Sequence, residues 1–447
     1  MNSAKAIFIS ALTFLALVAA SAPALDAARV AQLRREIREN YFVPDPLPAP
    51  DAKVYRVFSP AAGVRALALS YRTEFNLRVP AILYLPDPLP TRTIPAFVVV
   101  NGHGGDKYSW YSFYTGVLFA RAGAAVLTYD QIGEGERNSR HQSGTRAHDF
   151  IAGGPTMARH LAGLMICDAM EAVSVLRGQP GVDAGRIALG GYSLGSFVAA
   201  LTGAIDPRLR ACVLCGGGDL DGPGGYWDSS GKKMCQAWPW QSLAFLGDRP
   251  AMIYALHAAR GPTFIYNGLG DTVVAIPSHG EKFFTDLRQR TIQLHGGTND
   301  VFDFAFAPTN CGHRPYWLTR PVVEWLEKQI DFPNWTPEKI RALPAIRIGD
   351  WAAARHVPMD KLYATERREA GTPALDDNVP GYSRDSLDIL PPADWQLQKT
   401  NFILESWLAS VRKQAAEDVE PVRRSRDQKS KRVISPGNPR ERPHPAP

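Results

Sequence analysis

The sequence G-Y-S-L-G at residues 191–195 constrains the fold of this chain more than any other feature. It follows an apolar segment, R-I-A-L at residues 186–189, and precedes a second one, F-V-A-A-L at residues 197–201. A serine between two glycines, where a buried strand turns into a helix, is typical of a nucleophile elbow. Glycine is needed on both sides because a Cβ would collide with neighbouring backbone in so tight a turn. These flanks favour an elbow over a glycine-rich turn with an idle serine.

The rest of the chain predicts a sheet that can hold such an elbow. Apolar segments without polar alternation are typical of buried parallel strands, and here they lie at residues 96–101, 124–130, 211–214, 262–267 and 290–294. Helical or loop segments separate them, including a long helix at residues 156–177. Segments with more polar alternation at 53–58, 64–71 and 79–86 predict antiparallel strands ahead of the parallel ones. The fold class expected is α/β, with a doubly wound, mostly parallel sheet.

Composition shifts divide the chain into four parts. Residues 1–24 contain Lys5, an apolar run too short to span a bilayer comfortably and a small-residue cleavage site, as in a signal peptide. We therefore expect an exported protein, periplasmic or secreted, with no stable membrane insertion after cleavage; a retained anchor is the alternative. Residues 25–330 form the expected α/β domain, 331–412 a helical and loop extension, and 413–447 a basic tail predicted to be disordered.

Much of the net charge of +6 comes from basic residues in that tail. Outside the tail, nothing in the sequence indicates nucleic-acid binding. The five cysteines have no zinc-finger spacing. Cys212 and Cys215 lie in one predicted strand and should face opposite sides of the sheet. Cys235 and Cys311 lie in loops near the expected site, and an oxidising compartment would allow them to form a disulfide.

Two downstream loops supply partners for Ser193. A serine hydroxyl needs a base within hydrogen-bond reach and an acid that orients the base. In this architecture these follow in the order serine, acid, histidine, each at the carboxyl end of a strand. Asp271 follows the strand at 262–267, and His313 follows the predicted strand at 290–294. We therefore predict a catalytic triad of Ser193, Asp271 and His313.

Other residues compete for the last two roles. Asp300 and Asp303 could supply the acid, but they lie on the histidine's side of the chain. His295, which ends the predicted strand, is the stronger rival base, whereas His279 is expected on the surface of a helix.

The sequence also predicts two backbone donors for an oxyanion. One is the N–H of Leu194, the residue after the nucleophile. The other is the N–H of His103, in the glycine-rich segment G-H-G-G at residues 102–105, where the glycines could also serve only the turn. No second histidine or acid at ligand spacing supports a metal-binding role for the His103 side chain.

Residues 216–250 interrupt the alternation of strands and helices and are rich in glycine and tryptophan. An insertion of this length after a strand predicts a lid or pocket wall. Its Trp227, Trp238 and Trp240 can be either core residues or a platform for a sugar or aryl group.

Taken together, these motifs resemble the α/β-hydrolase superfamily, and within it the branch of dienelactone hydrolases and acetyl xylan esterases. The resemblance covers about residues 50–330, and four segments carry it: N-G-H-G-G, Y-D-Q-I-G-E-G-E-R, V-D-A-G-R-I-A-L-G-G-Y-S-L-G-S and G-H-R-P-Y. Family members more often have H-G where this chain has Asn101-Gly102, and a small residue at the position of Ser196. Dienelactone hydrolases use a cysteine nucleophile, so Ser193 favours an esterase.

The resemblance implies an exported serine esterase that cleaves small-molecule or carbohydrate esters through an acyl-enzyme. That reaction requires no metal or organic cofactor. Two alternatives stay open: a peptidase of the prolyl-oligopeptidase type, although the chain lacks the length for a gating propeller, and a catalytically silent hydrolase-fold binding protein.

Overall fold

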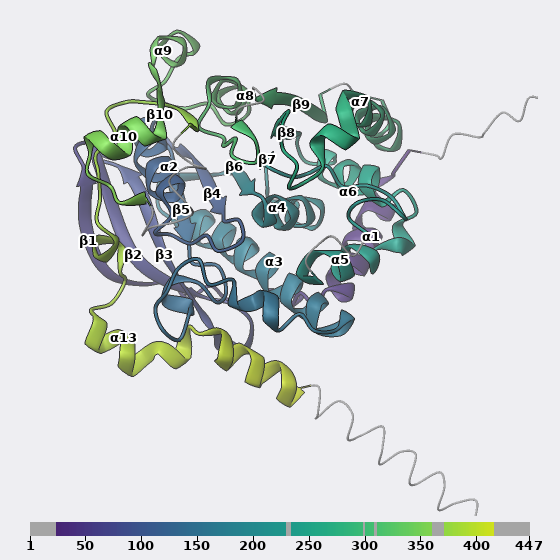
Figure 1. Ribbon diagram of the computed structural model, residues 1–447, viewed down its shortest axis with the longest axis horizontal. Helices are drawn as coiled ribbons and strands as arrows, with labels where there is room; N and C mark the ends of the chain where they lie inside the picture. The colour runs from purple at the N-terminus through teal and green to yellow at the C-terminus, as the bar shows by residue number, and fades with distance from the viewer. Residues whose placement is uncertain (1–23, 229–233, 298–299, 308–310, 360–370, 415–447) are drawn as a thin grey trace, which may run out of the picture.

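The computed structural model describes residues 24–228, 234–297, 300–307, 311–359 and 371–414 (Figure 1). Its centre is a nine-stranded sheet with the order β1-β2-β3-β5-β4-β6-β7-β8-β9. The strands are β1 (Lys53–Ala61), β2 (Val64–Arg72), β3 (Arg78–Pro86), β4 (Ile94–Val100), β5 (Ala125–Tyr129), β6 (Val182–Tyr192), β7 (Ala211–Cys215), β8 (Thr263–Gly268) and β9 (Phe302–Ala307).

Strand direction divides this sheet into two parts. The strands β1, β2 and β3 pair antiparallel, and β3 also pairs antiparallel with β5. From β5 through β4, β6, β7 and β8 to β9 every pairing is parallel. The carboxyl ends of six strands therefore meet at one edge, where sites of such sheets form. The predicted fold class, a mostly parallel sheet preceded by antiparallel strands, is confirmed.

Helices cover both faces of the sheet, and a separate apolar cluster lies on each face. One cluster takes side chains from α1 (Ala27–Asn40), α3 (Pro155–Gly178), α4 (Leu194–Ile205), α5 (Met234–Gln241), α6 (Arg249–Ala258) and α7 (Ile276–His295). The other takes side chains from α2 (Trp110–Arg121) and α8 (Arg320–Ile330). Cys212 packs in the first cluster and Cys215 in the second, so the prediction that they face opposite sides is confirmed.

The predicted strand at 290–294 is wrong, because these residues lie within helix α7. In α7 the buried Phe284, Leu287 and Thr291 recur at helical spacing, while most residues between them are polar. The last strand is instead β9, which contains Asp303. The loop of His313 thus follows β9, and the rival base His295 is the last residue of a helix.

The extension after residue 330 packs against both faces. It comprises α9 (Pro337–Ala342), β10 (Ala345–Arg347), α10 (Ile348–Ala354), β11 (Pro373–Leu375), α13 (Pro392–Gln398) and helical residues 404–414. Ile340, Trp351 and Trp395 belong to the cluster under α2 and α8. Leu404 and Trp407 belong to the opposite cluster, so the extension passes from one face to the other (Figure 1). The division into domains stays a prediction.

The insertion at 216–250 places its tryptophans mainly in the core. Trp227 and Trp240 are fully buried, and Trp227 stacks on Phe197 with ring centroids 5.7 Å apart. Trp238 is only partly buried. For Trp227 and Trp240 the structure therefore favours core packing over a platform for substrate.

Cys235 and Cys311 are both free thiols, so the proposed disulfide is wrong. Sγ of Cys235 lies instead against the side chains of His103 and Asp149.

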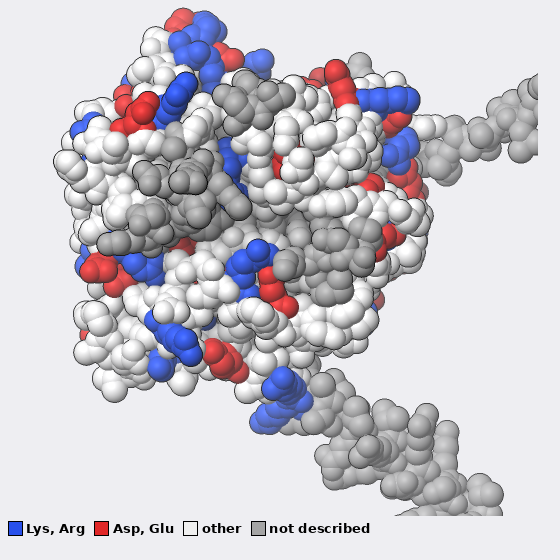
Figure 2. Space-filling model, viewed as in Figure 1, with Lys and Arg blue, Asp and Glu red and all other residues white. Residues whose placement is uncertain are grey.

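The predicted signal peptide, apart from Ala24, and all but the first two residues of the predicted basic tail fall outside the described residues. Within them, none of the helices has both the length and the apolar character needed to cross a bilayer. On the face drawn in Figure 2, basic and acidic side chains are interspersed among uncharged ones.

Candidate active site

The elbow forms at the junction of β6 and α4. Ser193 directly follows β6 and has φ 54° and ψ −116°, a conformation that L-residues rarely adopt. Its N–H donates to the carbonyl of Cys215 at the end of β7, at 2.9 Å. A Cβ on Gly191 would lie 2.2 Å from the carbonyl oxygen of Gly195, and one on Gly195 would lie 2.1 Å from that of Val100. Both glycines are therefore required for the strand and the helix to approach so closely.

The structure brings Ser193, His313 and Asp271 into one chain of hydrogen bonds. Nε2 of His313 lies 2.9 Å from Oγ of Ser193, and Nδ1 of His313 lies 2.7 Å from Oδ2 of Asp271. The Asp271 side chain is fully buried and that of His313 is 11% exposed. A buried carboxylate facing Nδ1 favours the tautomer with Nδ1 protonated, which leaves Nε2 able to accept the serine proton.

The loops after β8 and β9 fix the acid and the base. A Cβ on Gly268 would lie 2.1 Å from the carbonyl oxygen of Gly312, so these loops touch beside His313. Oδ1 of Asp271 accepts the N–H groups of Val273 at 2.9 Å and Val274 at 3.3 Å. These two bonds leave Oδ2 directed at the histidine.

The rival residues lie in other settings. Asp300 is exposed, Asp303 is half exposed and pairs with Arg288, and His295 ends helix α7. His279 is not a plain surface residue as expected, because its side chain is only 11% exposed and faces two carboxylates. Nδ1 of His279 lies 3.0 Å from Oδ2 of Asp219, and Nε2 lies 3.2 Å from Oδ2 of Asp221. Burial alone would lower the pKa of His279, but these two carboxylates outweigh it and raise the pKa to about 9.

The two predicted oxyanion donors lie on segments that meet at the elbow. Leu194 is the first residue of α4, where N–H groups have no acceptor within the helix. The glycine-rich segment follows β4, and a Cβ on Gly102 would lie 2.8 Å from the Tyr192 ring, next to Ser193. This loop therefore runs against the residue that precedes the nucleophile, where its backbone could reach a substrate.

The side chain of His103 has partners that the sequence did not reveal. His148, Asp149 and Cys235 place donor atoms around its ring, and all four donor atoms lie within 4.8 Å of one another. A second histidine and an acid therefore accompany His103 in space, although none lies at ligand spacing in the sequence. Burial, with a contribution from His103, lowers the pKa of His148 to about 3, so its ring is neutral. Burial and the nearby Asp149 hold the pKa of Cys235 well above its usual value.

A buried ion network surrounds Lys107, which follows the glycine-rich segment at 102–105. Nζ of Lys107 lies 2.7 Å from a carboxylate oxygen of Asp130 and 2.7 Å from one of Glu136, and all three side chains are fully buried. Asn101 adds a bond from its Nδ2 to the carbonyl of Tyr129 at 2.7 Å and accepts one from Ser112 at 2.9 Å. The sequence did not single out Lys107, because its partners lie more than twenty residues away in the chain.

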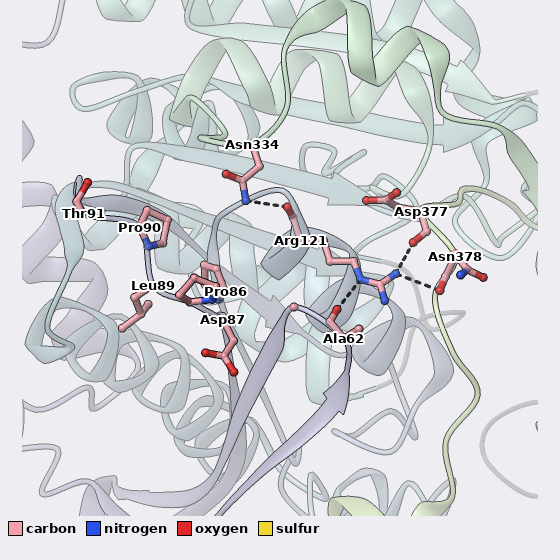
Figure 3. Close-up of a pocket in the computed structure, with 12 residues that line it drawn as sticks. Ala62, Pro86, Asp87, Leu89, Pro90, Thr91, Arg121, Asn334, Asp377 and Asn378 are labelled. Carbon is pink, nitrogen blue, oxygen red and sulfur yellow. Dashed lines mark hydrogen bonds between the residues drawn. The ribbon is translucent and has the colours of Figure 1, made fainter.

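The pocket in Figure 3 is separate from this site. It is lined by residues from the β1–β2 turn, the end of β3, Arg121, Asn334 and the segment at 377–378. The β3–β5 pairing places Tyr84 opposite Val126, near the amino end of β5. The end of β3 therefore lies at the sheet edge opposite the carboxyl ends that hold Ser193 and Asp271. Arg121 closes one side by donating to carbonyls that include those of Ala62 and Asn378 (Figure 3).

Known proteins resemble parts of this chain. Residues 48–215 match the acetyl xylan esterase (AXE1) family. The hydrolase ORFZ of Pyricularia oryzae is 34% identical over 163 residues, which cover 35% of this chain and 33% of that protein. The α/β hydrolase psoB of Aspergillus fumigatus is 29% identical over 157 residues, 34% of this chain and 32% of that protein. The chain thus spans about a third of the length of these curated relatives.

Among solved structures, methylesterase BT1017 superposes with a TM-score of 0.54 and 20% identity, covering 88% of this chain and 76% of that one. That likeness shows the fold. It agrees with the strand order, with the elbow between β6 and α4, and with the sequence resemblance noted above. The chain is therefore an α/β-hydrolase-fold protein that resembles the acetyl xylan esterase family over residues 48–215.

Proposed function

We propose that this protein is a serine esterase that cleaves carboxylic esters, with acyl groups on carbohydrate as the substrate class. The observation that carries the proposal is the continuous hydrogen-bonded chain from Ser193 through His313 to Asp271 at the carboxyl edge of the sheet. The match of residues 48–215 to the acetyl xylan esterase family supports the choice of bond and of substrate class.

The reaction proceeds in two halves. Oγ of Ser193 attacks the ester carbonyl while Nε2 of His313 takes its proton, and the alcohol leaves with that proton from His313. Water then attacks the acyl-enzyme with His313 again as base, which releases the acid and restores Ser193. Asp271 orients His313 and stabilises its charged form. The N–H groups of Leu194 and His103 are the proposed donors to the oxyanion that forms in both halves.

Export to the periplasm or the medium belongs to the same proposal. It is supported by the signal-like composition of residues 1–24. A polymeric carbohydrate ester would meet the enzyme in that compartment.

Labelling and turnover together test the catalytic role of Ser193. The protein is treated with a fluorophosphonate probe and the adduct is mapped by mass spectrometry, and hydrolysis of p-nitrophenyl acetate is compared between wild type and Ser193→Ala. We expect the adduct on Ser193 and loss of nearly all turnover in the variant. Undiminished turnover in the variant would refute the triad, and absence of labelling would favour a silent binding protein.

Acetylated xylan oligosaccharides and proline-containing peptides then separate the esterase from the peptidase alternative. Release of acetate that depends on Ser193 supports the proposal. Cleavage of the peptide without release of acetate contradicts it.

A further inference from the structure

Four side chains converge beside the predicted oxyanion loop from three separate segments. His103 comes from the loop after β4, and His148 and Asp149 come from the 3-10 turn η3 (Ala147–Phe150). Cys235 comes from the first turn of α5, within the insertion at 216–250. Each offers one atom that binds transition metals well: two imidazole nitrogens, one carboxylate oxygen and one sulfur.

Four of the six distances between these atoms are close to the edges of a tetrahedron, and the two from His148 to His103 and to Cys235 are no longer than 4.8 Å. Nε2 of His103 lies 3.3 Å from Sγ of Cys235 and 3.3 Å from Oδ1 of Asp149. Oδ1 of Asp149 lies 3.3 Å from Nε2 of His148 and 3.4 Å from Sγ of Cys235. Bond lengths of about 2.0–2.3 Å to Zn²⁺ in tetrahedral geometry require donor atoms about 3.3–3.7 Å apart. The four measured distances lie within a few tenths of an ångström of that range.

Hydrogen bonds join Cys235 to His103 and to Asp149, but they do not account for the position of His148. The side chain of His148 is fully buried, and Nε2 makes no hydrogen bond to any of the residues that the structure describes, although Oδ1 of Asp149 is 3.3 Å away. A buried polar nitrogen without a hydrogen bond destabilises the folded state, so it needs another partner. An ion between Nε2 and Oδ1 would satisfy both atoms at that separation.

The surroundings suit a divalent cation. A thiolate and a carboxylate with two neutral imidazoles carry two negative charges, which balance Zn²⁺. Oδ2 of Asp149 is already held by Nη2 of Arg146 at 2.9 Å, so the carboxylate is oriented with Oδ1 toward the other donors. The carboxylate of Glu134 accepts the N–H groups of Thr145 and Arg146 and fixes the segment that leads into η3.

We propose that His103, His148, Asp149 and Cys235 bind one structural zinc ion. Binding converts the Cys235 thiol to a zinc thiolate and releases its proton to solvent, with no change of oxidation state. Mixed nitrogen, sulfur and oxygen donors in tetrahedral geometry select Zn²⁺ over Mg²⁺ and Ca²⁺, which prefer oxygen ligands in larger shells. All four positions are filled by protein atoms, so the ion is structural and the ester chemistry stays with Ser193.

The ion would clamp the lid-like insertion to the oxyanion loop. His103 lies in that loop, and the N–H of Gly144 donates to the carbonyl of Gly104 at 3.1 Å, joining the loop to the segment before η3. Cys235 is the link to the insertion. A role for this ion in catalysis rests on the proposed function. On that basis, the zinc ion acts as a positioning group for the backbone N–H of His103.

Metal content tests the site independently of activity. The full chain is purified under reducing conditions, incubated with excess ZnCl₂, passed through a desalting column and analysed for zinc by plasma mass spectrometry. We expect close to one zinc ion per chain in wild type and a loss of at least tenfold in Cys235→Ser and in His148→Ala. Co²⁺ in place of Zn²⁺ should give the visible absorption of a tetrahedral site and a thiolate charge-transfer band that Cys235→Ser lacks.

Cys311→Ser is the matched control, since Cys311 is also a free buried thiol but is not one of the four proposed ligands. It should retain the ion. Wild type that holds no zinc after desalting, or Cys235→Ser that holds as much as wild type, overturns the proposal. If a variant misfolds, the cobalt spectrum of the wild type still decides the matter, because a spectrum without the thiolate band excludes Cys235 as a ligand. Labelling of Ser193 by the fluorophosphonate is scored separately, so failure of the zinc site and failure of the esterase are distinguishable.

Discussion

Ser193 holds a backbone conformation that costs about 1–3 kcal/mol for a residue with a side chain. Its φ of 54° and ψ of −116° are maintained by the hydrogen bond to Cys215 and by the tight packing of Gly191 and Gly195. The conformation lifts Oγ out of the sheet toward Nε2 of His313. In the proposed mechanism, the reactivity of the serine therefore depends on groups that never touch the substrate, and Asp271 is the first of these.

Asp271→Asn should lower kcat for p-nitrophenyl acetate by about 10³–10⁴-fold while the protein stays folded. The asparagine carbonyl can still accept the N–H groups of Val273 and Val274, so the loop keeps its shape. Its NH₂ group would then face Nδ1 of His313 and favour the tautomer with the proton on Nε2, which cannot accept from Ser193. Steady-state kinetics and circular dichroism check both halves of this expectation.

Asp303→Asn serves as the control for the same chemical change, because Asp303 lies on β9 with its side chain 51% exposed. Its kcat should stay within about twofold of wild type, since exposed substitutions cost little. Equal losses in the two variants would contradict the assignment of Asp271 as the orienting acid.

At this scale the sequence predicted the triad residues but not the cluster around His103. Ser193, Asp271 and His313 could be placed because each follows a recognisable glycine-bearing turn in a known order along the chain. His148, Asp149 and Cys235 have no such signal, because they come from η3 and α5 and meet His103 only through tertiary packing. Spacing in sequence finds ligands that lie on one element and misses those that different loops bring together.

At the scale of elements, α4 shows how closely the strands and helices of this fold approach. Gly195 sits in the first turn of α4, and a Cβ there would lie 2.1 Å from the carbonyl oxygen of Val100 and 2.7 Å from that of Asn101. Both oxygens belong to backbone at the end of β4 and cannot move aside as a flexible side chain would. The position of α4 against β4 thus sets the position of the Leu194 N–H.

Gly195→Ala should therefore destabilise the protein by about 1–3 kcal/mol and reduce esterase turnover more than tenfold. The added methyl group forces the start of α4 away from β4, which moves the Leu194 N–H from the oxyanion position. Urea unfolding and p-nitrophenyl acetate kinetics measure the two effects. Gly178→Ala is the control, because nothing lies within 4 Å of its Cβ at the end of α3, and alanine should leave stability equal or up to about 1 kcal/mol higher. A Gly195→Ala protein as stable and active as wild type would contradict this reading of the elbow.

The pairing of His279 with Asp219 and Asp221 ties α7 to the loop after β7. The pKa of His279 is raised to about 9 against the model-peptide value of 6.5, so the folded state binds a proton that the unfolded state releases between these values. The stabilisation is therefore complete below pH 6.5 and is lost as the pH rises toward 9. His279→Gln should be markedly less stable than wild type at pH 6, with the difference shrinking by pH 9.5. Urea titrations at the two pH values test this, and a difference independent of pH would show that the pairing acts by packing alone.

Sequence patterns predicted most elements and failed at α7. The apolar segments of β4, β5, β7 and β8 are short, continuous and bounded by turns, which is typical of buried parallel strands. Residues 290–294 contain only two large apolar residues among polar ones and sit at the end of a long amphipathic helix. A short segment with that composition fits either structure, and the helical spacing upstream decides it.

At the scale of the whole molecule, the extension after residue 330 contributes to the core on both faces of the sheet. Helical residues 404–414 place Trp407 in the cluster under α3, and its Nε1 donates to Oε1 of Glu74 at 2.7 Å. Burial raises the pKa of Glu74 to about 8, so its carboxyl group is largely protonated at neutral pH. A titratable group thus stands at the contact between the extension and the loop before β3.

This placement predicts how stability changes with pH. The folded state keeps the proton of Glu74 up to about pH 8, whereas the unfolded state releases it near pH 4.5. Between these values folding retains a proton that the unfolded chain lacks, so this group lowers stability by about 1.4 kcal/mol for each pH unit of increase. Glu74→Gln removes the proton but keeps an oxygen that accepts from Trp407. The stability of the variant should therefore fall less steeply from pH 5 to 8 than that of wild type, and the two curves should diverge as the pH rises.

Urea unfolding at several pH values measures the two slopes. Glu338→Gln is the control, because Glu338 is an exposed carboxylate on α9 with a lowered pKa. Its replacement should leave the slope of stability between pH 5 and 8 unchanged. A Glu74→Gln slope equal to that of wild type would mean that Glu74 is ionised in the folded protein. The contact with Trp407 would then be a charged hydrogen bond over this whole range, and Trp407→Phe would destabilise the protein by the same amount at pH 5 and at pH 8. With Glu74 protonated up to about pH 8, the same substitution should instead cost more above pH 8 than at pH 5, because the indole N–H lowers the pKa of Glu74 and so favours its ionised form.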